Sequence, residues 1–92
     1  MLCHDGTADH ERSMFMKYDH RIAAQTIGAL RVQRNMSQKE LAIKAGLARS
    51  HYAMVESGAK CASVETLWKI ADALGIRLSE LFRMIEDQAG MQ

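Results

Sequence analysis

The sequence lacks several patterns that mark common classes of protein. It has no proline, and no apolar run comes near the roughly 18 residues that a membrane-spanning helix needs. The first 13 residues lack the basic start and apolar centre of a secretory signal, so we expect a cytoplasmic protein. The chain has two cysteines, Cys3 and Cys61, and in a reducing compartment we expect free thiols rather than a disulfide.

Catalytic and ligand-binding motifs are also missing. The chain has no nucleophile–base pair, no metal-ligand spacing and no phosphate-binding loop. We therefore expect neither an enzyme nor a cofactor or small-molecule ligand. Cys3, His4 and His10 could bind a metal, but they form no paired ligand motif. We interpret residues 1–17 as a flexible arm.

The charge of the chain is uneven along its length. The formal net charge is only +1 over 92 residues, a length that predicts a single domain. Between Arg21 and Lys60, however, seven basic and two acidic residues give a local net charge of 7 − 2 = +5. Such a segment can supply the phosphate contacts of a nucleic-acid-binding protein. The alternative is an ordinary solvated helical surface.

The stretch from Ser37 to Gly58 predicts two short helices with a tight turn between them. Ser37 and Glu40 form the capping-box pattern at the start of the first helix, and Gly46 is placed to end it. A second helix is predicted from about Arg49 to Ser57. This arrangement is typical of a helix-turn-helix, whose second helix lies in the major groove of DNA with its first residues at the base edges.

Three further helices are predicted around this motif, and no segment has a strand pattern. Their bounds are Tyr18 to Asn35, Ser63 to about Leu74, and Glu80 to about Asp87. The predicted N-caps are Asp19, Ser63 and Ser79. Residues 88–92 are expected to fray. The sequence therefore predicts an all-α domain of five helices that spans residues 18–87.

Apolar residues at helical spacing mark the side of each helix that should face the core. Within the motif these residues are Leu41, Ala42, Ala45, Tyr52 and Val55. Trp68 lies beside the apolar stripe of its helix, and we expect it to be a half-buried packing residue.

The order and spacing of these motifs resemble the Xre family of bacterial and phage regulators, which are similar to the lambda and 434 repressor DNA-binding domains. The matching segments are RNMSQKELA (34–42), AGL (45–47), VESG (55–58), TLWKIADALGI (66–76) and LF (81–82). The resemblance covers roughly Ile22 to Phe82 and implies a five-helix, lambda-repressor-like domain. Small members of the family include phage repressors, restriction–modification controllers and antitoxins.

The start of the second motif helix holds the candidates for reading DNA bases. Arginine can donate two hydrogen bonds to guanine, so Arg49 is the first candidate, with a phosphate contact as the alternative. Ser50 can bond to a base or a phosphate, and Met54 can contact a thymine methyl group. His51 either contacts phosphate or is a plain surface residue.

A second group of residues is expected to contact the DNA backbone. By charge alone these are Arg34, Lys39 and Lys60. The resemblance implies that Gln38 bonds to a phosphate and braces the first side chain of the recognition helix, here Arg49. It also places Ser57 where similar repressors touch the backbone.

The resemblance further implies a partly buried, structural ion pair between Arg31 and Glu56. Three positions depart from the family pattern. Ser57 stands where an arginine is common, Ala62 where a proline is common, and Ala48 where a serine or threonine usually caps the recognition helix.

The leading hypothesis is a transcriptional regulator that binds a palindromic operator in double-stranded DNA as a homodimer. Leu81, Phe82 and Ile85 of the last helix are the expected dimer surface, with closure of a monomer core as the alternative. The second hypothesis is an antitoxin-like module that binds a partner protein, with DNA binding secondary.

Overall fold

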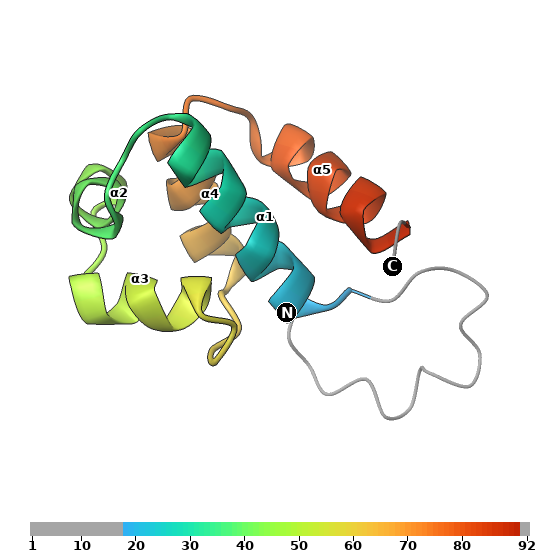
Figure 1. Ribbon diagram of the computed structural model, residues 1–92, viewed down its shortest axis with the longest axis horizontal. Coiled ribbons are helices and arrows are strands. Elements are labelled where there is room, and N and C mark those ends of the chain that lie inside the picture. Colours follow the sequence, from blue (N-terminus) through green and yellow to red (C-terminus); the bar gives the residue numbers. More distant parts are fainter. Residues whose placement is uncertain (1–17, 91–92) are drawn as a thin grey trace.

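Five α-helices form the part of the protein that the computed structural model describes, residues 18–90 (Figure 1). The helices are α1 (His20–Gln33), α2 (Gln38–Ala45), α3 (Arg49–Glu56), α4 (Val64–Ala73) and α5 (Leu78–Gly90). The expected all-α, five-helix fold is confirmed. The predicted arm and the last two residues lie outside the described range.

The helix ends that were predicted from local patterns are present. The Ser37 hydroxyl accepts from the Glu40 N–H at 3.0 Å, and the Glu40 carboxylate accepts from the Ser37 N–H at 2.7 Å. Gly46 ends α2 with a φ of +73°, in the left-handed region that favours glycine. Asp19 and Ser63 cap α1 and α4 as predicted.

Two helices have bounds that differ from the prediction. Helix α1 is shorter at both ends, because Asp19 is its cap and Asn35 takes a positive φ of 56°. Helix α5 begins at Leu78, so Ser79 lies inside the helix and the prediction that it caps the helix is wrong. The Glu80 carboxylate instead accepts from the Arg77 N–H at 2.8 Å. The helix continues to Gly90, three residues beyond the predicted end at Asp87, so residues 88–90 do not fray as expected.

The helices pack in two layers around one core. In Figure 1, α1 crosses in front of α4, α2 and α3 lie together at one end, and α5 lies at the other. Helix α1 contacts α3 and α5, while α4 contacts α2 and α5. The largest fully buried side chains come from all five helices: Ile27, Leu41, Tyr52, Leu67, Ile70 and Leu81. The core therefore holds α2 against α4 and α3 against α1.

Two predictions outside the motif are wrong. Trp68 is 63% exposed rather than half-buried, because it lies beside the buried stripe of Leu67, Ile70 and Ala71 on α4 and not within it. Cys61 is disulfide-bonded rather than free, and Cys3 lies outside the described residues. None of the helices between residues 18 and 90 has the length and apolarity to cross a membrane.

Candidate nucleic-acid interface

Helix α3 turns one face to the core and the other to solvent. Tyr52 and Val55 are buried, as predicted. Arg49, Ser50 and Met54 are exposed, and Met54 leaves 48% of its surface accessible. Ser50 and Met54 are four residues apart, and side chains at that spacing lie on the same side of a helix. The structure thus brings three of the predicted base-reading residues onto one outer face, while His51, at its margin, is partly exposed.

The start of α3 has no side-chain cap. Ala48 occupies the N-cap position in an extended conformation, and it offers no acceptor to the first turn. The first N–H groups of a helix have no partner within the helix. At the start of α3 these donors therefore remain available to an anionic group such as a phosphate.

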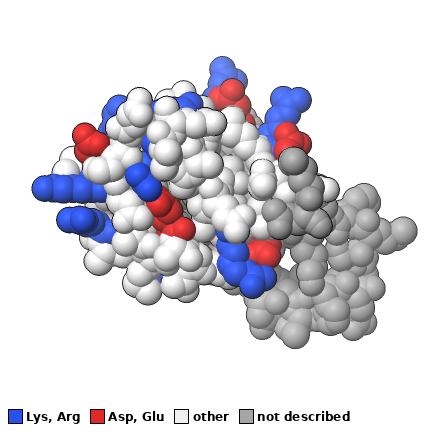
Figure 2. All heavy atoms as spheres, in the orientation of Figure 1, with Lys and Arg blue, Asp and Glu red and all other residues white. Residues whose placement is uncertain are grey.

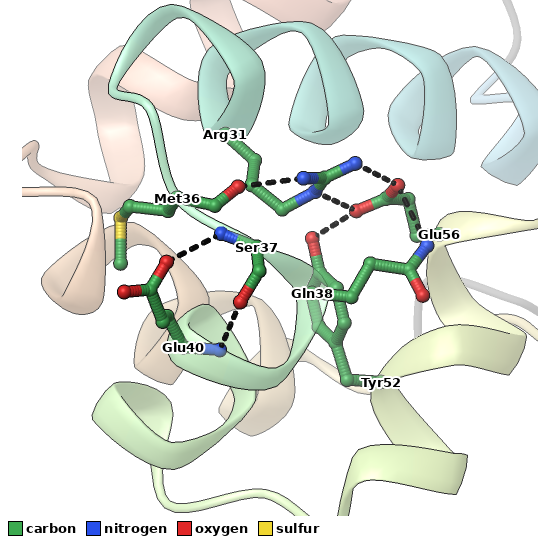
Figure 3. Close-up of polar contacts among 7 residues, drawn as sticks. All are labelled: Arg31, Met36, Ser37, Gln38, Glu40, Tyr52 and Glu56. Carbon is green, nitrogen blue, oxygen red and sulfur yellow. Dashed lines mark hydrogen bonds and ion pairs between the residues drawn. The ribbon is translucent and has the colours of Figure 1, made fainter.

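The Glu56 carboxylate joins three helices at the other end of α3 (Figure 3). Arg31 Nε donates to Glu56 Oε1 at 2.8 Å, and Arg31 Nη2 donates to Oε2 at 3.0 Å. Gln38 Nε2 donates to Oε2 at 3.0 Å, and the Tyr52 hydroxyl donates to Oε1. Arg31 also donates to the Met36 carbonyl oxygen at 2.6 Å. The structure contains the expected ion pair, but as the centre of a larger network.

Burial and hydrogen bonding act in opposite directions on Glu56. The side chains of Arg31 and Glu56 are only 17% and 12% exposed. Burial alone raises the pKa of Glu56, but hydrogen bonds from Arg31, Tyr52 and Gln38 outweigh it and hold the pKa below its usual range. Burial, together with the hydrogen bond to Glu56, raises the pKa of Tyr52. At neutral pH the Glu56 carboxyl group is therefore ionised and the Tyr52 hydroxyl is neutral.

Gln38 makes a contact that the resemblance did not imply. Its amide donates to Glu56, and no hydrogen bond joins it to Arg49 among the described residues. Gln38 is the first residue of α2, and Glu56 is the last residue of α3. Their contact therefore fixes the start of one motif helix against the end of the other. The predicted phosphate contact of Gln38 and its bracing of Arg49 concern the complex with DNA and stay predictions.

The basic side chains expected at the DNA backbone separate into two groups. Lys39 follows Gln38 on α2, Lys60 follows α3, and both are exposed. Arg34 instead lines an open hollow of about 560 Å³ at the ends of α1 and α4, together with Lys44 and Asp72. Figure 2 shows Lys and Arg side chains projecting from the end of the molecule that carries α2 and α3.

Ser57 is engaged at the end of α3. Its hydroxyl donates to the Met54 carbonyl oxygen at 2.9 Å and accepts from the Ala59 N–H at 3.2 Å. The Lys60 N–H donates to the same Met54 carbonyl at 3.2 Å. Ser57 therefore shapes the turn from which the Lys60 side chain extends.

The predicted dimer surface on α5 is largely enclosed by the protomer itself. Leu81 and Ile85 are 0% and 3% exposed within the core, and Phe82 packs against it partly buried. Their assignment to a dimer surface is wrong for Leu81 and Ile85, because a side chain covered by its own protomer cannot meet a partner. The burial of Leu81 and Ile85 agrees with the alternative prediction, in which these side chains close the core of a monomer.

Sequence reasoning missed two members of the Glu56 network, the Tyr52 hydroxyl and the Met36 carbonyl. Tyr52 and Glu56 are four residues apart, and residues at this spacing are neighbours on a helix. That spacing was a usable signal for a hydrogen bond. The Met36 contact had no sequence signal, since every residue offers a carbonyl.

Comparisons with known proteins agree with this geometry. The family model described as Helix-turn-helix matches residues 27–81. The control protein C.MunI of a Mycoplasma species is 41% identical over 54 residues, which cover 59% of this chain and 73% of that protein.

Solved structures of restriction–modification controller proteins are also similar to this chain. The restriction–modification controller protein C.AhdI from Aeromonas hydrophila has a TM-score of 0.67 and 38% identity, covering 70% of this chain and 97% of that one. The controller C.Esp1396I, solved as a tetramer with its natural 35 base-pair operator, has a TM-score of 0.73 over 79% of this chain and 96% of that one. Its identity of 20% supports the fold alone. Because the family model matches more than half of the chain, the chain belongs to the helix-turn-helix family.

Proposed function

We propose that this protein is a cytoplasmic, sequence-specific DNA-binding regulator of transcription. It binds a palindromic operator as a homodimer, with α3 of each protomer in the major groove. The outer face of α3 carries the proposal, because it presents Arg49, Ser50 and Met54 on a helix whose other face is fixed to α1 and α2. The relatives are controller proteins, which favours a regulator over an antitoxin-like module.

The roles of the side chains follow from their positions. Arg49 reads a guanine with two donors, and Met54 contacts a thymine methyl group. Lys39 and Lys60 contact phosphates and set the orientation of the domain. Gln38 acts through Glu56, by holding the start of α2 against α3.

A gel-shift titration against the DNA upstream of the protein's own gene, at two salt concentrations, tests the function. We expect binding that weakens steeply with salt, because phosphate contacts release counterions. Arg49→Ala should lose affinity by about 1–3 kcal/mol and relax sequence preference. Arg83→Ala, which removes an exposed arginine from α5, is the matched control and should bind like the parent protein.

The possible outcomes separate the parts of the proposal. Unchanged, salt-sensitive binding by Arg49→Ala would move base reading to other residues of α3. A folded, helical protein that binds no upstream DNA at low salt would overturn the regulator function itself.

A further inference from the structure

An arginine of α1 lies against the turn that follows the recognition helix. In Figure 1 the start of α1 lies beside the chain that leaves α3. The open side of Gly58 faces Arg21, because a Cβ atom at Gly58 would lie 3.4 Å from Arg21 Cγ and 3.8 Å from Arg21 Cα. Lys60, whose side chain is exposed, is two residues further along the same turn. Arg21 therefore lies beside the end of α3 that is proposed to contact the DNA backbone, although it belongs to neither motif helix.

Asp19 holds the guanidinium of Arg21. Arg21 Nε donates to Asp19 Oδ1 at 3.2 Å, and Arg21 Nη2 donates to Oδ2 at 3.1 Å. Within residues 18–90, no group accepts from Arg21 Nη1. The Arg21 side chain is 73% exposed. Because a guanidinium has more donors than this pair uses, Arg21 keeps donors for a second anion.

We propose that Arg21 binds a backbone phosphate of the operator, next to the phosphate bound by Lys60. The proposal rests on the proposed function and extends its DNA-contacting surface from the motif to α1. A phosphate fits this place because a guanidinium matches its oxygens in geometry and charge. The carboxylate of Asp19 neutralises part of the Arg21 charge and opposes the approach of a phosphate. Arg21 thus adds affinity without reading sequence, since phosphate contacts carry no base information.

The salt dependence of binding measures this contact. Each phosphate contact contributes about 0.9 to the slope of log affinity against log salt. Arg21→Gln should weaken binding and reduce this slope by about 0.9 for each bound protomer. Over a roughly fourfold rise in salt, the advantage of the parent protein should therefore shrink by about 3.5-fold per protomer. Arg83→Gln, the same substitution at an exposed position on α5, is the matched control and should leave the slope unchanged.

Two DNA duplexes separate a phosphate contact from base reading. The titrations use the upstream DNA and an unrelated duplex of the same length. Arg21→Gln should weaken binding to both duplexes by the same factor, whereas Arg49→Ala should weaken binding to the upstream DNA more. A slope equal to that of the parent protein, or a loss confined to the upstream duplex, would overturn the proposal.

Substitution of Asp19 tests the opposing charge. Asp19→Asn removes the carboxylate and keeps a residue type that caps helices well. It should raise the affinity for both duplexes by about twofold to fivefold, because the Arg21 cation is no longer neutralised. Glu80→Gln makes the same change in net charge at the carboxylate that accepts from the Arg77 N–H at the start of α5, and should have a smaller effect. Weaker binding by Asp19→Asn would contradict the proposal.

A conservative variant separates loss of charge from loss of structure. Arg21→Lys keeps the cation and should retain most of the slope, because lysine also binds phosphate. Circular dichroism and thermal unfolding establish that each variant stays folded, as the exposure of Arg21 favours. A slope that falls equally in Arg21→Lys and Arg21→Gln would argue against a phosphate contact.

Failure of this contact and failure of the proposed function give different results. If the parent protein prefers the upstream DNA and Arg21→Gln keeps its slope, the regulator stands and the contact is absent. If Arg21→Gln reduces the slope but the parent protein has no preference for the upstream DNA, the contact stands and sequence-specific regulation fails. A parent protein that binds neither duplex at low salt would overturn both.

Discussion

Tyr52 and Glu56, one turn apart on α3, share a hydrogen bond at the carboxylate oxygen that also accepts from Arg31 Nε. The tyrosine ring lies wholly in the core while its hydroxyl reaches the ion pair. One side chain therefore connects the apolar packing of α3 to the charged contact that joins α3 to α1.

Replacing Tyr52 with phenylalanine keeps the ring and removes the hydroxyl. Tyr52→Phe should lower the free energy of unfolding by about 1.5–3 kcal/mol, the usual contribution of a hydrogen bond to a charged group. Urea unfolding at neutral pH measures the change. Tyr18→Phe is the matched control, since Tyr18 is partly buried without a side-chain hydrogen bond in the described structure, and its effect should stay within about 0.5 kcal/mol. Equal losses in both variants would contradict the role of the Tyr52 hydroxyl.

Replacing Arg31 with methionine leaves the Glu56 carboxylate without its cation. Because both side chains are largely buried, Arg31→Met should destabilise the fold by about 3–5 kcal/mol and lower the melting temperature sharply. Arg21→Met provides the comparison, because Arg21 forms an ion pair with Asp19 but is 73% exposed. Thermal unfolding should show a much smaller change there. A small effect of Arg31→Met would mean that the network contributes little.

Acid should weaken the protein through Glu56. The pKa of Glu56 is lower in the folded chain than its ordinary value of 4.5, so unfolding is accompanied by proton uptake in this range. The stabilisation is complete above pH 4.5 and is lost as the pH falls through the lower, folded value. Urea unfolding from neutral pH downward should show this loss.

A second carboxylate, that of Asp19, also contributes to the loss of stability in acid, and its substitution provides the control. The pKa of Asp19 is also lowered, chiefly by its hydrogen bond from Arg21. Glu56→Gln should flatten the loss of stability below pH 4.5, whereas Asp19→Asn should leave most of it. The same pH dependence in Glu56→Gln as in the parent protein would assign the loss to other groups.

The uncapped start of α3 offers a gain in stability. Ala48→Ser supplies an acceptor for the first turn and should stabilise the protein by about 0.5–1 kcal/mol, since serine is among the best N-caps. Ser37→Ala makes the reverse change at the start of α2 and should destabilise by about 0.5–2 kcal/mol. Chemical unfolding of both variants measures the two changes in the free energy of unfolding, which should have opposite signs. No gain from Ala48→Ser would indicate that the turn cannot place the hydroxyl over α3.

The parts of the fold that were predictable from the sequence depend on neighbouring residues. The Ser37–Glu40 capping box and the Gly46 end of α2 use contacts within one turn, so residue types alone indicate them. The start of α5 was misplaced because Glu80 provides the cap contact that was assigned to Ser79.

The parts that were not predictable depend on packing between helices. An apolar stripe looks the same whether it closes the core or meets a partner, so Leu81 and Ile85 could not be assigned from spacing. The orientation of Trp68 likewise depends on which sides α2 and α5 cover. Gln38 has several hydrogen-bonding choices, and only the folded chain selects Glu56.

The helix-turn-helix motif depends on Arg31, a residue that lies outside it. Arg31 lies 25 residues before Glu56 in sequence, outside the segment from Ser37 to Gly58. A peptide cut to that segment would contain the residues of both helices, yet it would lose the guanidinium that neutralises Glu56 and ties it to α1. The angle between α2 and α3 is thus a property of the whole domain, and grafting the two helices onto another scaffold would require a substitute for Arg31.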